Sequence, residues 1–109
     1  MKLKCVLSVL VLLLAAQAFA GKIYGSISEG DKPVAQGTKV EVACGTNNYT
    51  AQTDGYGAFN LFATDKGKCV LKVSYQGQSP SIEINSYDNS VQYDLILEKQ
   101  GTQYTLKRK

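Results

Sequence analysis

Residues 53–59, TDGYGAF, contain the clearest indication of the fold. Two glycines flank a tyrosine, and a phenylalanine follows at the end of the stretch. Asp54-Gly55 is a strong hairpin signal, and Gly57 supplies a second position that tolerates a left-handed or bulged backbone. We therefore expect the chain to reverse here, with Tyr56 at the tip and Phe59 as the first inward residue of the returning strand. A glycine-rich phosphate cradle would instead require a helix N-terminus directly after the loop.

Alternation of apolar and polar residues on both sides of this turn predicts an all-β domain. After residue 21 no useful length of the chain has a helical period, and turn residues break the alternation about every eight to twelve positions. Seven strands are expected, at 22–29, 38–44, 48–53, 58–63, 68–75, 79–85 and 90–98. A weaker eighth segment, 102–107, either extends a sheet or frays.

The apolar residues of the predicted strands fall on one face of each strand. Side chains alternate between the two faces of a strand, so residues two apart share a face. The expected inward residues are Ile23, Gly25, Ile27, Phe59, Leu61, Cys69, Leu71, Val73, Val91, Tyr93, Leu95 and Leu97, with Val40, Val42, Cys44, Ile82 and Ile84. This pattern predicts a two-layered antiparallel sandwich.

The first 20 residues have the parts of a secretory signal peptide. MKLKCVLSVLVLLLAAQAFA begins with two lysines, continues with a short apolar stretch and ends in small residues, so cleavage is expected after Ala20. A membrane anchor would need about 20 apolar residues without the interruption at Gln17. The sequence thus predicts a secreted or periplasmic protein with a signal peptide at 1–20, a domain at 21–98 and a basic tail or extra edge strand at 99–109.

The two cysteines expected to remain after cleavage predict a disulfide. Cys5 leaves with the signal peptide, and an even number of cysteines in an oxidising compartment indicates pairing. Cys44 ends the second predicted strand and Cys69 begins the fifth, so both lie at the same end of an alternating sandwich. Two thiols without histidine are too few ligands for zinc, and neither a metal nor a cofactor is expected.

Charge and composition argue against nucleic acid, a membrane span and catalysis. Removal of Lys2 and Lys4 lowers the 12 basic side chains to ten against nine acidic ones, a net charge of about +1 in the mature chain. No histidine is present to act as a base or to activate a serine. Four of the five aspartates lie in predicted turns, where turn capping explains them: Asp31, Asp54, Asp65 and Asp88. A non-catalytic protein is expected.

The mature chain resembles the carboxypeptidase regulatory-like domain, a group related to the transthyretin-like and collagen-adhesin B-type sandwiches. The resemblance rests on GKIYGSIS, KPVAQGTKVEV, TDGYGAFNL and KVSYQGQS. The matching positions are Gly25, Pro33, Val34, Gly37, Val40, Thr53, Asp54, Gly57, Phe59, Tyr75 and Gly77. The resemblance implies a seven-stranded immunoglobulin-like (prealbumin-like) β-sandwich that serves as a folding aid, a spacer or a surface-binding module. The cysteine pair is not part of that family's pattern.

Seven tyrosines and no tryptophan suggest a binding surface. Tyrosine provides amphipathic contact area at low entropic cost, for a protein partner or for sugar stacking. The turn of Tyr56 should share one end of the sandwich with Lys32 and Gln76, which form the candidate binding loops, and Tyr87 should lie at the opposite end. The alternative is a structural or assembly subunit of the cell envelope or surface that self-associates through an edge strand.

Overall fold

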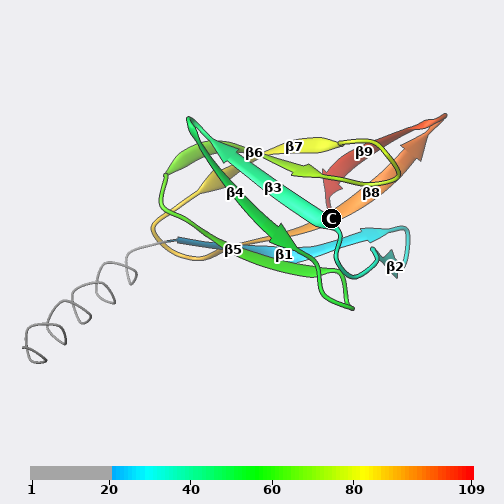
Figure 1. The fold of residues 1–109 in the computed structure, drawn as a ribbon, viewed down its shortest axis with the longest axis horizontal. Helices are drawn as coiled ribbons and strands as arrows, with labels where there is room; N and C mark the ends of the chain where they lie inside the picture. Colours follow the sequence, from blue (N-terminus) through cyan, green and yellow to red (C-terminus); the bar gives the residue numbers. More distant parts are fainter. Residues whose placement is uncertain (1–20) are drawn as a thin grey trace, which may run out of the picture.

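The computed structural model describes residues 21–109, and the signal peptide expected at 1–20 lies outside these residues. The described chain forms two stacked sheets (Figure 1). The strands are β1 (Gly21–Glu29), β2 (Lys32–Pro33), β3 (Lys39–Cys44), β4 (Asn47–Gln52), β5 (Ala58–Ala63), β6 (Gly67–Val73), β7 (Ser81–Ser86), β8 (Val91–Gln100) and β9 (Gln103–Arg108). Within residues 21–109, no helix is both long and apolar enough to cross a lipid bilayer.

Strand β1 is the centre of the five-stranded sheet. It pairs in parallel with β8 and antiparallel with β5, while the short β2 folds back onto its C-terminal end. Strand β9 pairs antiparallel with β8 and forms the far edge of this sheet. The second sheet has four antiparallel strands in the order β4-β3-β6-β7.

The hydrophobic core lies between the two sheets and consists of the residues expected from alternation. All 17 predicted inward side chains are buried, apart from Gly25, Ile82 and Val91, which are half-buried. Val34, Ala63 and Leu106 complete the core. The predicted β-sandwich is therefore confirmed at the level of its two layers and of the inward face of the six strands for which one was predicted. The expectation of an entirely antiparallel sandwich is wrong, because β1 and β8 run parallel.

The expectation of seven strands is wrong, because the described residues form nine. Lys32 and Pro33 close a tight hairpin onto the end of β1, and the segment after Gly101 pairs with β8. The strand predicted to reach Tyr75 ends at Val73 instead. Gln76 and Gly77 adopt positive φ angles of 51° and 73°, so the chain turns there in the geometry that suits a two-residue hairpin.

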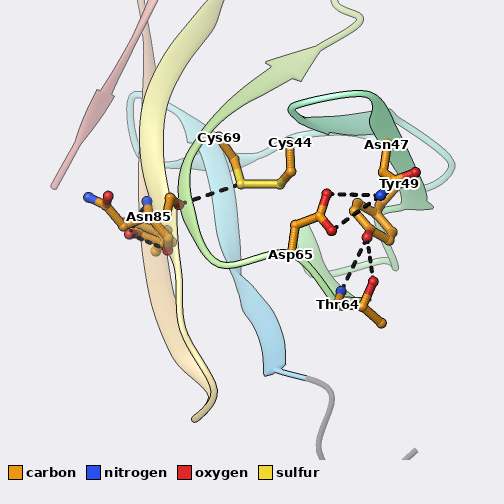
Figure 2. Close-up of a disulfide and its surroundings, with 9 residues drawn as sticks. Cys44, Asn47, Tyr49, Thr64, Asp65, Cys69 and Asn85 are labelled. Carbon is orange, nitrogen blue, oxygen red and sulfur yellow. Dashed lines mark hydrogen bonds between the residues drawn. A yellow bond between two sulfur atoms is a disulfide. The ribbon is translucent and has the colours of Figure 1, made fainter.

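The Cys44–Cys69 disulfide joins two neighbouring strands of the same sheet (Figure 2). Strands β3 and β6 pair up to Ala43 opposite Val70, so the next facing pair is the two cysteines. Their Cα atoms lie 4.4 Å apart, the spacing of directly opposed residues in a non-hydrogen-bonded antiparallel pair. Both side chains are buried, and the bond pins the β3–β6 ladder at its end.

Gly25 allows β1 to lie against β8. A Cβ atom at this position would be 1.8 Å from the carbonyl oxygen of Tyr93, so no other residue fits without moving the strand. The hydroxyl of Tyr93 reaches the other sheet, where it accepts the N–H of Asn85 at 2.8 Å and donates to its carbonyl at 3.0 Å. Tyr93 therefore satisfies backbone groups on the outer edge of β7 and ties the two sheets together.

Candidate functional site

The turn between β4 and β5 holds Tyr56 in the solvent. The Oδ1 atom of Asp54 accepts the N–H groups of Tyr56 at 2.8 Å and Ala58 at 3.0 Å, so the aspartate caps the turn from within. Gly57 has a φ angle of 75°, and a Cβ atom there would be 2.6 Å from the carbonyl oxygen of Ile27. The turn is thus anchored against β1, while 84% of Tyr56 is exposed.

A hollow of about 460 Å³ opens beside Tyr56. Ser26, Ser28 and Ile96 line it from the five-stranded sheet, and Asp31 lines it from the β1–β2 turn. The Ser28 side-chain oxygen is buried and, among the described residues, has no hydrogen-bond partner. The hollow therefore combines an aromatic wall with a carboxylate and hydroxyl groups.

A larger groove of about 900 Å³ lies on the other side of the β1–β2 hairpin. The hairpin, the turn after β6 and the last residues of β8 form its walls. Its charged residues are Glu29, Lys32, Glu98 and Lys99. With two acidic and two basic side chains, the groove has no dominant sign of charge.

Tyr75 is the ordered aromatic residue of this groove. Its hydroxyl donates a 2.5 Å hydrogen bond to Oε1 of Glu29, and its ring packs edge-on against Tyr104 with the ring centres 5.0 Å apart. The hydrogen bond to Glu29, together with burial, raises the pKa of the Tyr75 phenol above its ordinary value. The phenol is therefore a neutral hydrogen-bonding group throughout the physiological range.

Gln78 fixes the turn that carries Tyr75 and Gln76. Its Nε2 atom donates to the carbonyl oxygen of Thr102 at 2.7 Å, and its Oε1 atom accepts the N–H of Tyr104 at 2.9 Å. The side-chain amide thus hydrogen-bonds to the backbone at the start of β9, as a neighbouring strand would. These two hydrogen bonds hold this wall of the groove against the five-stranded sheet.

The three candidate binding residues lie at one end of the molecule but in two adjoining depressions. Tyr56 borders the hollow, whereas Lys32 and Gln76 line the groove. Gly30 and Pro33 line both depressions, so the β1–β2 hairpin is the ridge between them.

Two motif residues support the loop beside the groove. The Thr53 hydroxyl donates to the carbonyl oxygen of Ala35 at 2.8 Å and accepts the N–H of Thr38 at 3.1 Å. Gly37 has a φ angle of 88° and donates its N–H to the carbonyl of Thr53 at 2.8 Å. These contacts hold residues 35–38 against the strand that leads to the Tyr56 turn.

The opposite end is closed by polar contacts between the sheets (Figure 2). Asn47 donates to both carboxylate oxygens of Asp65, at 3.0 and 3.2 Å. Tyr49 and Thr64 bond through their hydroxyls at 2.9 Å. These contacts connect β4 to the segment after β5, and they leave that carboxylate engaged in structure. In the described chain, no group of three Cys, Asp or Glu side chains is placed to hold a metal ion.

Two aromatic residues outside the predicted loops also lie on the surface. Tyr24 and Phe62 occupy the outer face of the five-stranded sheet, where Phe62 is 59% exposed. The alternation rule contains the signal that could have identified them, because both fall on the outward side of their predicted strands.

Comparison with known proteins supports the fold and leaves the family open. No family model matches the chain, and no curated protein matches its sequence. A DUF3823 family protein from Parabacteroides merdae has a similar structure, with a TM-score of 0.58, 9% identity, and coverage of 82% of this chain and 58% of that protein.

A second similar structure is that of a Bacteroides uniformis protein described as "a putative carbohydrate binding protein". Its TM-score is 0.51 at 15% identity, with coverage of 81% of this chain and 53% of that protein. The present chain therefore spans a little over half the length of each neighbour. At such low identity the likeness establishes a shared β-sandwich fold.

Proposed function

We propose that the mature chain is a secreted or periplasmic, non-catalytic module that binds carbohydrate at the end bearing the Tyr56 turn. The exposed ring of Tyr56, carried beside the polar hollow on a turn that is anchored against β1, is the observation that carries this proposal. The apolar faces of sugar rings stack on aromatic side chains, while hydroxyl, carboxylate and amide groups bind their hydroxyls. A turn whose backbone is already anchored loses little backbone entropy on binding.

The buried hydroxyl of Ser28 adds to the chemical case for this ligand. An unpartnered buried hydroxyl lowers stability, by about 1–3 kcal/mol in typical cases. Ser28 lines the hollow, and a small rotation of its side chain would let a sugar hydroxyl or a water molecule there supply the partner. Asp31 at the rim is exposed, so its carboxylate can accept hydrogen bonds from a polyol.

Export is supported by the disulfide and by the pattern of the first 20 residues. Disulfides persist in oxidising compartments and are rare in the cytosol. Catalysis is disfavoured because the chain has no histidine and because Asp54 and Asp65 are engaged in structural hydrogen bonds.

The finer family assignment, to the carboxypeptidase regulatory-like group of immunoglobulin-like (prealbumin-like) sandwiches, belongs to this proposal. This assignment is supported by the structural roles of the residues that match the family's pattern. Gly25 and Gly57 permit close backbone approaches, and Thr53 braces the loop beside the groove.

Affinity gel electrophoresis tests the function. The chain 21–109 is run through gels containing amylose, xylan, laminarin, galactomannan or hydroxyethylcellulose. We expect retardation by at least one polymer and its loss in Tyr56→Ala. Tyr87→Ala is the matched control, because Tyr87 is also exposed (51%) but lies beside Gly21, at the start of β1. Equal retardation of wild type and Tyr56→Ala, or retardation by none of the polymers, would contradict the proposal.

A further inference from the structure

The outer face of the five-stranded sheet carries aromatic and amide side chains in register. Tyr24 on β1 lies opposite Asn60 on β5 and opposite Gln92 on β8, so one row across three strands reads amide, aromatic, amide. In the adjacent row Lys22 lies opposite Phe62. Directly opposed residues share a face of the sheet, so these five side chains form one surface.

The two aromatic rings of this surface are diagonal neighbours. Phe62 faces Lys22, two residues before Tyr24, and diagonal neighbours lie about 7–8 Å apart, within reach of aromatic side chains. The Nζ atom of Lys22 lies 5.2 Å from the centre of the Tyr24 ring, which holds the lysine over that ring. The two aromatic residues stand on paired strands, β1 and β5, so the backbone positions that carry them are set before any ligand arrives.

A hydrogen-bonded polar group continues the surface along β8. The Ser26 hydroxyl donates to Oδ1 of Asp94 at 3.1 Å, and Nε2 of Gln92 donates to Oδ2 of the same carboxylate at 3.0 Å. Asp94 is thus engaged by two neutral donors, and Oε1 of Gln92 is available for an outside donor. Asn60, across Tyr24, is exposed.

The surface is continuous with the hollow beside Tyr56. Ser26 and Ser28 line that hollow, and Ser26, Tyr24 and Lys22 follow on the same face of β1. From Ser28 to Lys22 the strand advances six residues, or about 20 Å at the usual rise per residue. A surface of this length accommodates several sugar units of an extended chain.

The charges of this face balance in number. Lys107 and Glu98 form a 2.9 Å ion pair, Lys22 and Asp94 contribute one charge of each sign, and so do Asp31 and Lys109 at the hollow. A face without unbalanced charge favours a neutral ligand over a nucleic acid or an acidic polymer.

The apolar area of the face is too small and too scattered for a stable protein interface. Of the described side chains, the large exposed apolar ones are Tyr56, Phe62, Val70 and Tyr87. Only Phe62 and Tyr56 lie on this face or at its end, and polar side chains separate them. Protein interfaces have contiguous, well-packed apolar centres.

From this geometry we infer that the outer face of the five-stranded sheet is a second section of the carbohydrate site, and that it binds an extended stretch of a neutral polysaccharide along β1. The inference rests on the proposed function of the Tyr56 end. Phe62 and Tyr24 stack on successive sugar rings, and the flexible Lys22 side chain moves off the Tyr24 ring as the sugar binds. Gln92 and Asn60 bind the sugar hydroxyls.

The test compares long and short oligosaccharides of the polymer that retards the wild type. By isothermal titration, Tyr24→Ala/Phe62→Ala should bind oligosaccharides of six or more units roughly four- to 100-fold more weakly, at about two- to tenfold for each ring. Disaccharides should bind with wild-type affinity, because they occupy only the Tyr56 end. Gln92→Ala, a surface change that spares the packing, should weaken long oligosaccharides alone.

The controls separate this inference from the proposed function. Val70→Ala, on the exposed face of the other sheet, should bind as wild type does. Wild-type binding of long chains by the double variant, with loss only in Tyr56→Ala, would overturn the extended site and leave the proposed function standing. Equal loss of long and short chains would also overturn the extension, since the flat face would then be the whole site. Binding of no polymer by the wild type would overturn both.

Discussion

Replacing both cysteines with alanine should lower the stability of the domain by a predictable amount. Cys44 and Cys69 enclose a sequence separation of 25 residues. In the chain-entropy model, closing a loop of that length stabilises the folded state by roughly 3.5 kcal/mol. Both sulfur atoms are also buried in the core, so Cys44→Ala/Cys69→Ala leaves a small cavity that adds to the loss.

The loss is large for a domain of this size. Domains of 60–100 residues shift in Tm by about 4–8 °C per kcal/mol, so the double variant should melt roughly 14–28 °C below the oxidised wild type. A stability of about 0.05–0.15 kcal/mol per residue gives the mature chain about 4–13 kcal/mol in total. The disulfide therefore supplies between about a quarter and most of the net stability.

Differential scanning calorimetry of the chain 21–109 measures this effect. One sample of the wild type is melted with its disulfide intact. A second sample is unfolded and refolded in reductant, so that the buried disulfide is reduced, and is then melted. The reduced wild type should melt near the double variant, and reductant should leave the variant unchanged. A variant that melts within a few degrees of the oxidised wild type would refute the argument from loop closure.

Three further substitutions test the packing of the sandwich. Gly25→Ala should lower the free energy of unfolding, measured in urea, by about 1–3 kcal/mol, because its Cβ atom would lie 1.8 Å from the Tyr93 carbonyl oxygen. An unchanged free energy of unfolding would mean that β1 and β8 can move apart without cost. Tyr93→Phe leaves the outward N–H and C=O of Asn85 unpaired and should cost about 1–3 kcal/mol, while light scattering should detect more self-association through β7; a monomer of full stability would contradict this. Tyr75→Phe should reduce the alkaline loss of stability. The unfolded phenol ionises near pH 10.0 and the folded one at higher pH, so its contribution is complete below pH 10.0 and is lost as the pH rises through the folded pKa. Equal slopes of unfolding free energy against pH above 10.0 for both proteins would refute the role of the Glu29 hydrogen bond.

The local features of this protein follow from the sequence alone. Alternation identified the inward face of six of the seven predicted strands, because side-chain direction in a strand depends only on residue parity. It also placed both cysteines inward, and the Asp54–Phe59 segment specified its own turn through the aspartate cap and a glycine of positive φ. These properties are set by residues close together in the chain.

Which strands lie side by side follows from long-range packing. The parallel pairing of β1 with β8 joins residues about 70 positions apart, and the disulfide proved to link neighbours in one sheet. The same long-range packing separated Tyr56 from Lys32 and Gln76 by a hairpin ridge, and brought Tyr24, Phe62 and Gln92 onto one face. Parity states which way a side chain points, whereas its neighbours across a sheet depend on how all the strands pack at once.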